Sequence, residues 1–398
     1  MESLLVKLVE KCVLDPFFPV SGPDAGLIAP EHFADRKKCS AEMTAGFLAI
    51  IIDAHRRTGN PLYLLIADVK EAYDNVWRDA LWAKALKAGA GAVEVRQARA
   101  LYENMAAKIV EDGYESEIVE FAQGIPQGGP RSGKLFALYN SDLPDALRKV
   151  GAGTVVGEVE ITCATFLDDS VVPTLSEPAA RAALRTLGHY GLRWSQQWST
   201  PKFKMMCVNV TDPPLQWPSG NHWFDTVTAT RYLGVYFDTV DGWGGHFAMK
   251  RAAAILARLE LRRAGLFGGR NAPLDSLEVA KAMLWATVDY GRGVASSQGH
   301  GCGRAAKALD AFHIGTLREI LGVSGCSVKA GVRGELGEIP DVWRERKRQL
   351  LVARQMLTSP EGSLMETCSA RQRLKPQTGD FPHRREIPAG LQRTHSQA

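Results

Sequence analysis

The sequence predicts an α+β fold, with strands concentrated before residue 240 and helices after it. Short apolar runs bounded by Gly, Pro or acidic residues indicate buried strands in the first part. From residue 246 onward the pattern is mostly helical, with breaks at 265–273 and 291–303. Strands followed by helices are typical of an α+β domain that precedes a helical one.

The first third of the chain alternates helical and strand patterns. Residues 40–57 have apolar side chains at helical spacing and end at the breaker Thr58-Gly59-Asn60-Pro61, and the apolar run that follows ends in an acidic residue, as a short buried strand does. The predicted helices are 40–57, 77–87 and 94–108, and the predicted strands are 63–69 and 116–121.

The second third begins with an irregular segment, because 124–130 holds three Gly and two Pro. Residues 158–167 and 170–173 flank Asp168-Asp169, which predicts a hairpin with two carboxylates at its bend. The other predicted elements are a helix at 134–147 interrupted near Pro144, a helix at 178–190 ended by Gly191, and strands at 205–210 and 228–236. Residues 356–398 are poor in large apolar side chains, so we expect a disordered tail.

The composition is that of a globular protein. The 398 residues are 45% hydrophobic and carry a net charge of +4, which alone does not predict nucleic-acid binding. The seven cysteines form no C-x-x-C pair, which disfavours disulfides and structural zinc and indicates an intracellular protein, nuclear or cytoplasmic and not secreted. The most apolar stretch, 47–52, is far too short for a bilayer, so we expect no membrane partner.

Two acidic clusters follow apolar strands, 100 residues apart. The first runs from Asp68 through Glu71 to Asp74, and the second is Asp168-Asp169. Carboxylates from separate strands that meet at one sheet edge can hold two Mg²⁺ ions for phosphoryl transfer. Each cluster taken alone is better explained as a set of solvated acids at a strand end. The glycine-rich segment between them, 123–133, would likewise be a plain loop if it stood alone.

The order of these three elements resembles a reverse transcriptase of the non-LTR retrotransposon type. Residues 65–76 look like motif A of that family, 124–143 like motif B and 166–169 like motif C. Residues 187–208 are similar to motif D and 231–235 to motif E, and the resemblance extends over roughly residues 25–355. It implies a right-hand polymerase fold. The implied domains are partial fingers (1–60), a palm with an antiparallel sheet and a fingers insertion near 77–122 (61–240), and a helical thumb and connection (241–355).

The resemblance also implies roles for single residues. Asp68 and Asp168 would bind two Mg²⁺ ions, with Mn²⁺ as a substitute, and Asp169 would support them. Tyr73 would be the gate that rejects a ribose 2′-hydroxyl, although an aromatic residue after a strand is otherwise usually core. Glu71, Gln127 and Gly128 would lie beside the incoming nucleotide. Lys202 would donate a proton to pyrophosphate, with Lys204 as the competing candidate. Without the resemblance, either lysine would be explained as a solvated residue at a strand edge.

Basic residues are concentrated in two places. Residues 246–270 hold six basic residues and one acidic residue, a net charge of +5. On a thumb helix, Lys250, Arg251, Arg258, Arg262 and Arg263 would face a primer–template duplex, although a solvated helix face is nearly as good an explanation. The second concentration, at 344–348, has no predicted role.

The sequence departs from the family pattern at three points. Residues 129–133 read Gly-Pro-Arg-Ser-Gly where Ser-Pro-Leu-Ser-Pro is usual, and Leu167 replaces the usual Ala. Little chain precedes motif A, and Arg36, Lys37 and Lys38 match only the later basic element of the fingers. We therefore expect an element truncated at its amino terminus or an incomplete gene model. Primer extension should be weak or absent, and nucleic-acid binding should be retained and steeply dependent on salt.

The predicted function is RNA-directed DNA synthesis. Its partners would be an RNA template, a DNA primer and deoxynucleoside triphosphates, and no oligomeric state is predicted. One alternative is a catalytically dead remnant that only binds nucleic acid. A metal-dependent phosphatase or nuclease is a weaker alternative, because it leaves Gln127 and motifs D and E unexplained.

Overall fold

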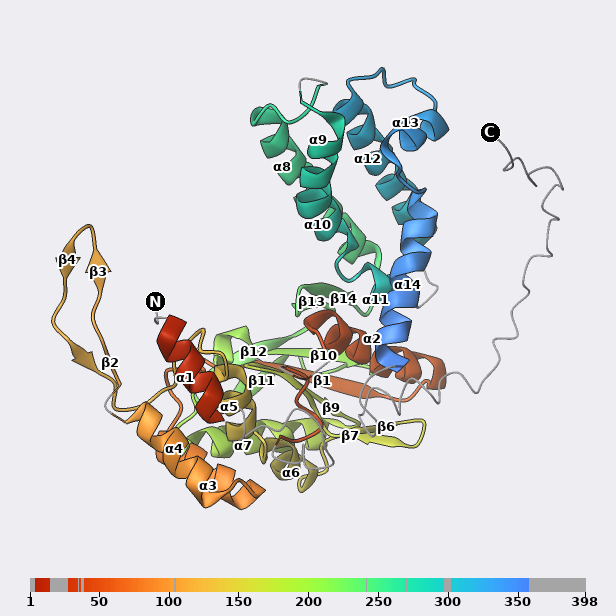
Figure 1. The fold of residues 1–398 in the computed structure, drawn as a ribbon. Coiled ribbons are helices and arrows are strands. Elements are labelled where there is room, and N and C mark those ends of the chain that lie inside the picture. Colours follow the sequence, from red (N-terminus) through yellow and green to blue (C-terminus); the bar gives the residue numbers. More distant parts are fainter. Residues whose placement is uncertain are drawn as a thin grey trace, which may run out of the picture.

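The structure is a computed structural model that describes residues 4–14, 28–34, 36, 39–103, 105–240, 242–268, 271–296 and 302–357. Lys37, Lys38, Arg270 and nearly all of the expected tail lie outside these residues. A central sheet carries helices on both sides, and a separate layer of helices rises from one of its faces (Figure 1). The predicted α+β fold is thus observed.

The central sheet has six strands in the order β11-β12-β10-β1-β9-β8. Its middle strand β1 is buried at six of seven positions, and it pairs antiparallel with β10 on one side and with β9 on the other. The strands are β1 (Leu62–Asp68), β8 (Ala164–Phe166), β9 (Asp169–Thr174), β10 (Lys204–Val208), β11 (Gln216–Ser219) and β12 (His222–Val227). The predicted strand at 63–69 and the predicted hairpin with its acidic bend are confirmed.

The sheet is not wholly antiparallel, which corrects the expectation. β12 runs parallel to β10, because the hairpin of β11 and β12, absent from the prediction, returns the chain beside β10 in the same direction. The predicted strand at 158–167 is divided into β7 (Val159–Ile161), which pairs with β6 (Thr154–Val156), and β8. The predicted strand at 228–236 folds into a hairpin of β13 (Ala229–Tyr232) and β14 (Val235–Asp238), because Leu233 and Gly234 adopt left-handed backbone with φ of 46° and 77°.

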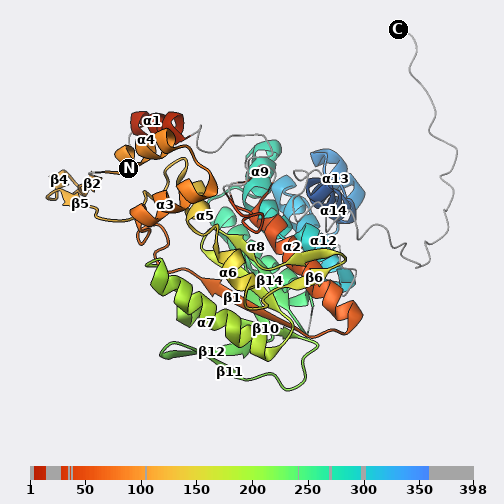
Figure 2. The same ribbon diagram turned by 90° about the horizontal axis from the view of Figure 1, so that it is seen from below.

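Helix α7 (Glu177–Arg193) covers one face of the sheet, the face seen in Figure 2. Ser176 caps its first turn through the amide of Ala179, but the helix does not end at Gly191 as predicted. Gly191 is buried, and a Cβ there would lie 2.5 Å from the carbonyl oxygen of Gln196. This glycine therefore permits close approach of the following loop and does not end the helix.

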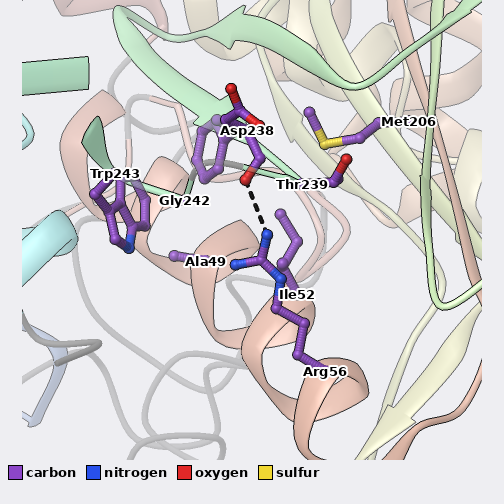
Figure 3. Close-up of a pocket in the computed structure, with 9 residues that line it drawn as sticks. Ala49, Ile52, Arg56, Met206, Asp238, Thr239, Gly242 and Trp243 are labelled. Carbon is purple, nitrogen blue, oxygen red and sulfur yellow. Dashed lines mark hydrogen bonds between the residues drawn. The ribbon is translucent and has the colours of Figure 1, made fainter. Parts of the chain in front are cut away.

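Helix α2 (Ala41–Thr58) lies on the opposite face, between the sheet and the upper helices. Ser40 accepts a hydrogen bond from the amide of Met43, and Gly59 ends the helix with φ of 74°, as the sequence predicted. Its apolar side packs into a core shared with the sheet and with the upper helices. A small cavity of about 10 Å³ remains at this junction, where Arg56 donates a hydrogen bond to the carbonyl of Asp238 (Figure 3).

A second core, beside the sheet, is built from α1 (Leu4–Leu14), α3 (Arg78–Ala88), α4 (Ala92–Tyr102) and α5 (Ser132–Tyr139). The predicted helix at 134–147 is instead α5 followed by α6 (Leu143–Arg148), and Pro144 lies in the first turn of α6, where its missing N–H costs little.

Helix α4 ends at Tyr102, short of the predicted residue 108, because residues 105–121 form an arm of two successive pairs of strands, β2 with β5 and β3 with β4. Its strands are β2 (Ala106–Ala107), β3 (Val110–Glu111), β4 (Tyr114–Glu115) and β5 (Val119–Glu120). The arm projects away from the body (Figure 1), and Ile109, Tyr114 and Ile118 on it are each at least 70% exposed.

The upper layer is formed by helices from residue 244 onward, as predicted. They are α8 (Gly244–Arg263), α9 (Pro273–Ala280), a π-helical turn (Lys281–Trp285), α10 (Ala286–Asp289), α11 (Arg292–Ser296), α12 (Cys302–Leu321), α13 (Lys329–Leu336) and α14 (Asp341–Leu357). Helix α11 falls within the predicted break at 291–303. Among the described residues, no helix combines the length and the apolar character needed to span a bilayer.

Candidate active site

The acidic residues of the two clusters come together at one end of the β1–β9 pair. Asp68 ends β1 and lies directly opposite Asp169, the first residue of β9. Residues opposite each other in an antiparallel pair project on the same face, so these two carboxylates are neighbours. Asp168 occupies the turn between β8 and β9, and its carbonyl accepts a hydrogen bond from the amide of Val69, 3.2 Å away. The structure therefore brings all three predicted acids to the same sheet edge.

The turn that carries Asp168 is strained. Leu167 precedes it with φ of 56°, a left-handed conformation that costs a branched side chain about 1–3 kcal/mol. Leu167 is the residue that departs from the usual Ala of motif C. Such strain is typical of functional sites, where the surrounding structure holds a turn in place.

Burial and neighbouring negative charge raise the pKa of two of these carboxylates, Asp169 and Asp168. Burial is the largest cause for Asp169, and the neighbouring charges of Asp168 and Asp68 add to it, so that its pKa rises to about 6. Burial also raises the pKa of Asp168, with Asp68 contributing. Clustered carboxylates that resist joint ionisation in this way create a negative potential that attracts cations.

Lys202 forms an ion pair with this acidic cluster. Its Nζ lies 2.8 Å from Oδ2 of Asp68, and this contact raises the lysine pKa. The preceding loop is fixed against motif A, because the amide of Ser199 donates to the carbonyl of Asp68 and the amide of Lys70 donates to the carbonyl of Gln197. Lys204, the competing candidate, lies in β10 opposite Ile66.

An open cleft of about 780 Å³ lies beside the acidic residues. Tyr73 is half-buried there, with its ring centroid 5.4 Å from that of Phe136, and Glu71 is exposed in left-handed backbone. The cleft is lined by residues 69–73, Gln127, Asp168, 198–202 and His222. It therefore unites predicted residues of motifs A, B, C and D. His222 was not a candidate, because it lies on the unpredicted strand β12 and no local signal marks it.

The motif B loop is attached to motif A by backbone hydrogen bonds. The amide of Gly124 donates to the carbonyl of Val76, and the amide of Ile125 donates to the carbonyl of Tyr73, at 2.8 and 2.9 Å. A Cβ on Gly124 would lie 2.8 Å from the carbonyl oxygen of Asp74, so glycine is required for this approach. Gly128 has φ of 85°, and the Gln127 amide lies 3.5 Å from the Asp74 carboxylate.

The unusual Gly129 of motif B has a structural explanation in α1. Glu10 is 3% exposed and accepts a 2.9 Å hydrogen bond from the Tyr102 hydroxyl. A Cβ on Gly129 would lie 3.0–3.1 Å from both carboxylate oxygens of Glu10 and 2.5 Å from Oγ of Ser132. The Cβ of the usual serine would therefore clash with Oγ of Ser132 and press against the Glu10 carboxylate. Sequence reasoning missed Glu10, because 119 residues separate it from the loop that it contacts.

The basic residues of α8 do not form one free face. Arg258 donates to Glu319 at 3.0 Å, and Arg262 is paired with the same carboxylate. Lys250 lies 4.6 Å from the ring centroid of Tyr290. Arg251 and Arg263 are exposed and make no ion pair within the described part of the chain. Arg36, matched to the later basic element of the fingers, donates to the carbonyls of residues 28 and 29.

The residues at the sheet edge fit a hard divalent cation. Mg²⁺ prefers carboxylate oxygens, and three carboxylates meet at this edge, two of which, Asp168 and Asp169, have raised pKa values. Within the described residues, however, no three His, Cys, Asp or Glu side chains are already grouped as ligands of one ion. Asp68 binds Lys202 instead, so a bound metal would compete with this ion pair.

The fold and the site define a class of protein. An α+β domain with carboxylates from two strands at one sheet edge has the arrangement that metal-dependent phosphoryl-transfer enzymes use. Residues 3–237, more than half of the chain, match the family described as "Reverse transcriptase (RNA-dependent DNA polymerase)". The chain belongs to this family.

Two relatives are similar over a shorter stretch. The RNA-directed DNA polymerases from the mobile element jockey of Drosophila melanogaster and Drosophila funebris are 29% and 27% identical to the chain over 146 residues. These matches confirm the resemblance to reverse transcriptases of the non-LTR type. The alignment covers 36% of this chain and 15% of each relative.

Solved telomerase structures share a distant likeness. Apo telomerase from Candida tropicalis is 11% identical, with a TM-score of 0.43, and covers 91% of this chain and 61% of its own. Telomerase from Candida albicans, in complex with a fragment of telomeric RNA, is 10% identical, with a TM-score of 0.40, and covers 92% of this chain and 57% of its own.

Proposed function

We propose that the chain is the RNA-directed DNA polymerase of a non-LTR retrotransposon. The observation that carries the proposal is the register that sets Asp68 opposite Asp169, with Asp168 in the adjoining turn and Lys202 on Asp68. The cleft beside these residues also contains Tyr73 and Gln127. A phosphatase or nuclease would need only the acids, so the shared cleft favours the polymerase.

The proposed reaction joins a DNA primer to a deoxynucleoside triphosphate that is selected by an RNA template. The primer 3′-hydroxyl attacks the α-phosphate, and pyrophosphate leaves. Asp68, Asp168 and Asp169 would hold two Mg²⁺ ions, which supply activation of the hydroxyl and stabilisation of the leaving oxygen when bound. Lys202 is the proposed proton donor to pyrophosphate, because its Nζ is at the acidic edge and Lys204 belongs to the neighbouring strand.

The remaining roles follow from position in the cleft. Tyr73 packs against Phe136 and lines the cleft, where its ring would exclude a 2′-hydroxyl. Gln127 and Gly128 would border the base, and Glu71 would border the phosphates. We assign the sheet to the palm, the helices from residue 244 onward to the thumb, and α1, α3, α4 and the arm to the fingers. Arg251 and Arg263 are the proposed duplex contacts of the thumb.

The test is primer extension on an RNA template with Mg²⁺ or Mn²⁺. Extension by the wild type should be weak, and Asp168→Asn should abolish it while duplex binding is retained, since the thumb is untouched. Asp212→Asn, an exposed acid in a loop, is the matched control and should stay active. Binding without extension in the wild type would identify a dead remnant, and hydrolysis without extension would identify a nuclease or phosphatase.

A further inference from the structure

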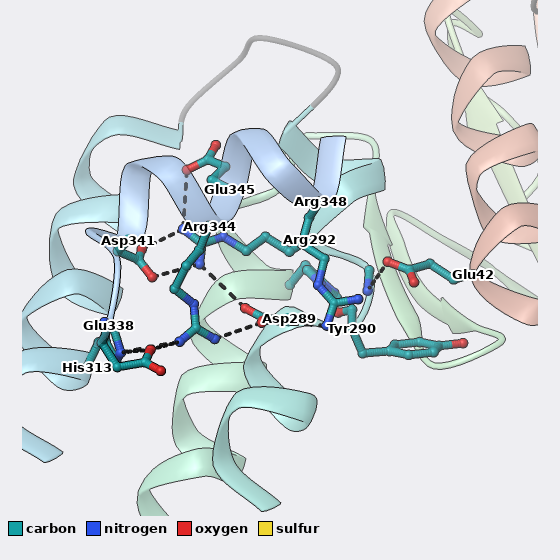
Figure 4. Close-up of polar contacts among 12 residues, drawn as sticks. Glu42, Asp289, Tyr290, Arg292, His313, Glu338, Asp341, Arg344, Glu345 and Arg348 are labelled. Atoms are coloured by element: carbon teal, nitrogen blue, oxygen red, sulfur yellow. Dashed lines mark hydrogen bonds and ion pairs between the residues drawn. The ribbon is translucent and has the colours of Figure 1, made fainter. Parts of the chain in front are cut away.

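The basic run at 344–348 is divided between two faces of α14. Arg344 and Arg348 point inward to Asp289 of α10, with nitrogen–oxygen distances of 2.8 and 3.6 Å, and Arg344 also reaches Glu338 (Figure 4). Glu345 points inward as well and binds the buried Arg292 at 3.2 Å. These residues hold α14 against the other upper helices, so their charges are already neutralised.

The opposite face of α14 is exposed and has no partner in the described residues. Its members recur at helical spacing, and they are Trp343, Arg346, Lys347, Leu350, Leu351 and Arg354. We call this set the outer stripe. Trp343 is 55% exposed and Leu350 is 71% exposed, and the guanidinium of Arg346 lies 5.1 Å from the Trp343 ring centroid. The three cations make no ion pair with any described acid, and the stripe contains no acidic residue.

This chemistry selects a polyanion that also presents flat apolar groups. Along about 17 Å of helix, Trp343 is followed by Arg346 and Lys347, then by Leu350 and Leu351, and then by Arg354. Apolar and cationic groups thus alternate along the helix axis. A membrane-binding helix requires them to be segregated onto two sides, which is not the case here. A single-stranded nucleic acid alternates phosphates and unstacked bases in the same way, and exposed aromatic side chains with nearby arginines bind such strands.

We propose that the outer stripe binds single-stranded RNA. The choice of RNA rests on the proposed function, because in that reaction the uncopied template is the strand that remains unpaired. No residue of the outer stripe lines the proposed catalytic cleft. It would hold template outside the primer–template duplex.

The test compares two substrates without nucleotides present: a blunt RNA–DNA duplex, and the same duplex with about 20 unpaired RNA residues. The wild type should bind the extended substrate more tightly. The triple variant Arg346→Ser/Lys347→Ser/Arg354→Ser should reduce this gain in affinity, the ratio between the two substrates, by about ten-fold. It should also make the slope of log affinity against log salt concentration shallower by about 2, since each single-strand phosphate contact contributes ~0.7 to that slope. Trp343→Ala should also reduce the gain by about ten-fold. Binding of the blunt duplex should not change.

The matched control removes the same charge from exposed lysines and arginine on other elements, Lys87→Ser/Lys149→Ser/Arg185→Ser, and should preserve the gain. Photocrosslinking of 4-thiouridine in the unpaired RNA should label residues 341–357. An equal loss of the affinity gain in the stripe variant and in the control variant, or photocrosslinks confined to other segments of the chain, would overturn the inference. An unchanged gain together with altered self-association of the Trp343→Ala variant would instead show that the stripe binds protein. A wild type that extends primers but binds both substrates equally tightly rejects only this inference, and a wild type that binds the extended substrate more tightly but does not extend primers rejects only the proposed function.

Discussion

Acidification should weaken the fold through His246, a fully buried residue at the junction of β14 and α8. Its Nδ1 accepts a hydrogen bond from the amide of Tyr236, and its Nε2 donates to the carbonyl of Tyr290, both at 3.2 Å. Protonation of Nδ1 would turn this acceptor into a donor, so that its N–H would face the N–H of the Tyr236 amide. Burial, with the charge of Lys250 in addition, lowers the pKa of His246 from 6.5 to about 4.

The sign and size of the effect follow from this difference. Between pH 6.5 and about 4, the unfolded chain binds a proton that the folded chain does not, so the free energy of unfolding falls as the pH falls. The stabilisation is fully present above pH 6.5. The pKa values differ by 6.5 − 4, about 2.5 pH units, and at 1.36 kcal/mol per unit the full loss is about 3 kcal/mol.

The assay is urea unfolding followed by tryptophan fluorescence from pH 7.5 to 4.5. His246→Asn keeps an acceptor for the Tyr236 amide but does not titrate, so it should be less stable at pH 7.5. Because the range ends at pH 4.5, above the folded pKa, the variant should lose about 2.5 kcal/mol less than the wild type over it. His32, whose pKa burial also lowers to about 4, is present in both chains and cancels in the difference. Exposed His189→Asn is the control and should follow the wild type. Parallel curves for the wild type and His246→Asn would refute the reasoning.

Three further outcomes are expected. Tyr73→Val should raise ribonucleotide incorporation relative to deoxyribonucleotide in steady-state extension, and an unmoved ratio in an active enzyme would assign Tyr73 to the core. Gly129→Ser should lower stability by about 1–3 kcal/mol, because the added Cβ clashes with Ser132 and presses against Glu10. Glu10→Ala should restore part of this loss in a double-mutant cycle, and additive effects would contradict the contact with Glu10. Lys84 donates to the Tyr139 carbonyl, the Asp142 carboxylate and the Tyr190 hydroxyl. Lys84→Ala should therefore lower the free energy of urea unfolding by about 3–5 kcal/mol, and Lys84→Met, which keeps the apolar stem, should lower it by less. Equal losses would show that the hydrogen bonds alone matter.

Strand ends and their acids were predictable because each depends on a short, continuous pattern. The apolar run before Asp68 and the bend at Asp168 are local features, and an antiparallel pairing of the two strands brings both acids to the same edge. The left-handed pair Leu233-Gly234 was missed, since leucine is not a usual turn residue there. The end of α7 was misplaced because Gly191 serves packing and not capping.

Contacts between distant segments set the limit of prediction. Nothing near Glu10 in the sequence indicates that its carboxylate lies against Gly129, or that Lys84 enters a group of aromatic rings formed by Tyr139, Tyr190 and Trp194. The basic pattern of α8 was visible, but its neutralisation by Glu319 depends on the packing of α12. These features arise from tertiary structure, which local patterns do not contain.

The arm at 105–121 has a consequence for how copies of the chain meet. An isolated two-stranded ribbon with open edges and exposed Ile109, Tyr114 and Ile118 is a template for intermolecular sheet formation. The same seventeen residues carry five acidic side chains against one lysine, a net charge of −4. Two arms brought edge to edge therefore repel each other, and we expect this charge to keep concentrated solutions of the protein free of arm-to-arm aggregates at neutral pH and low salt.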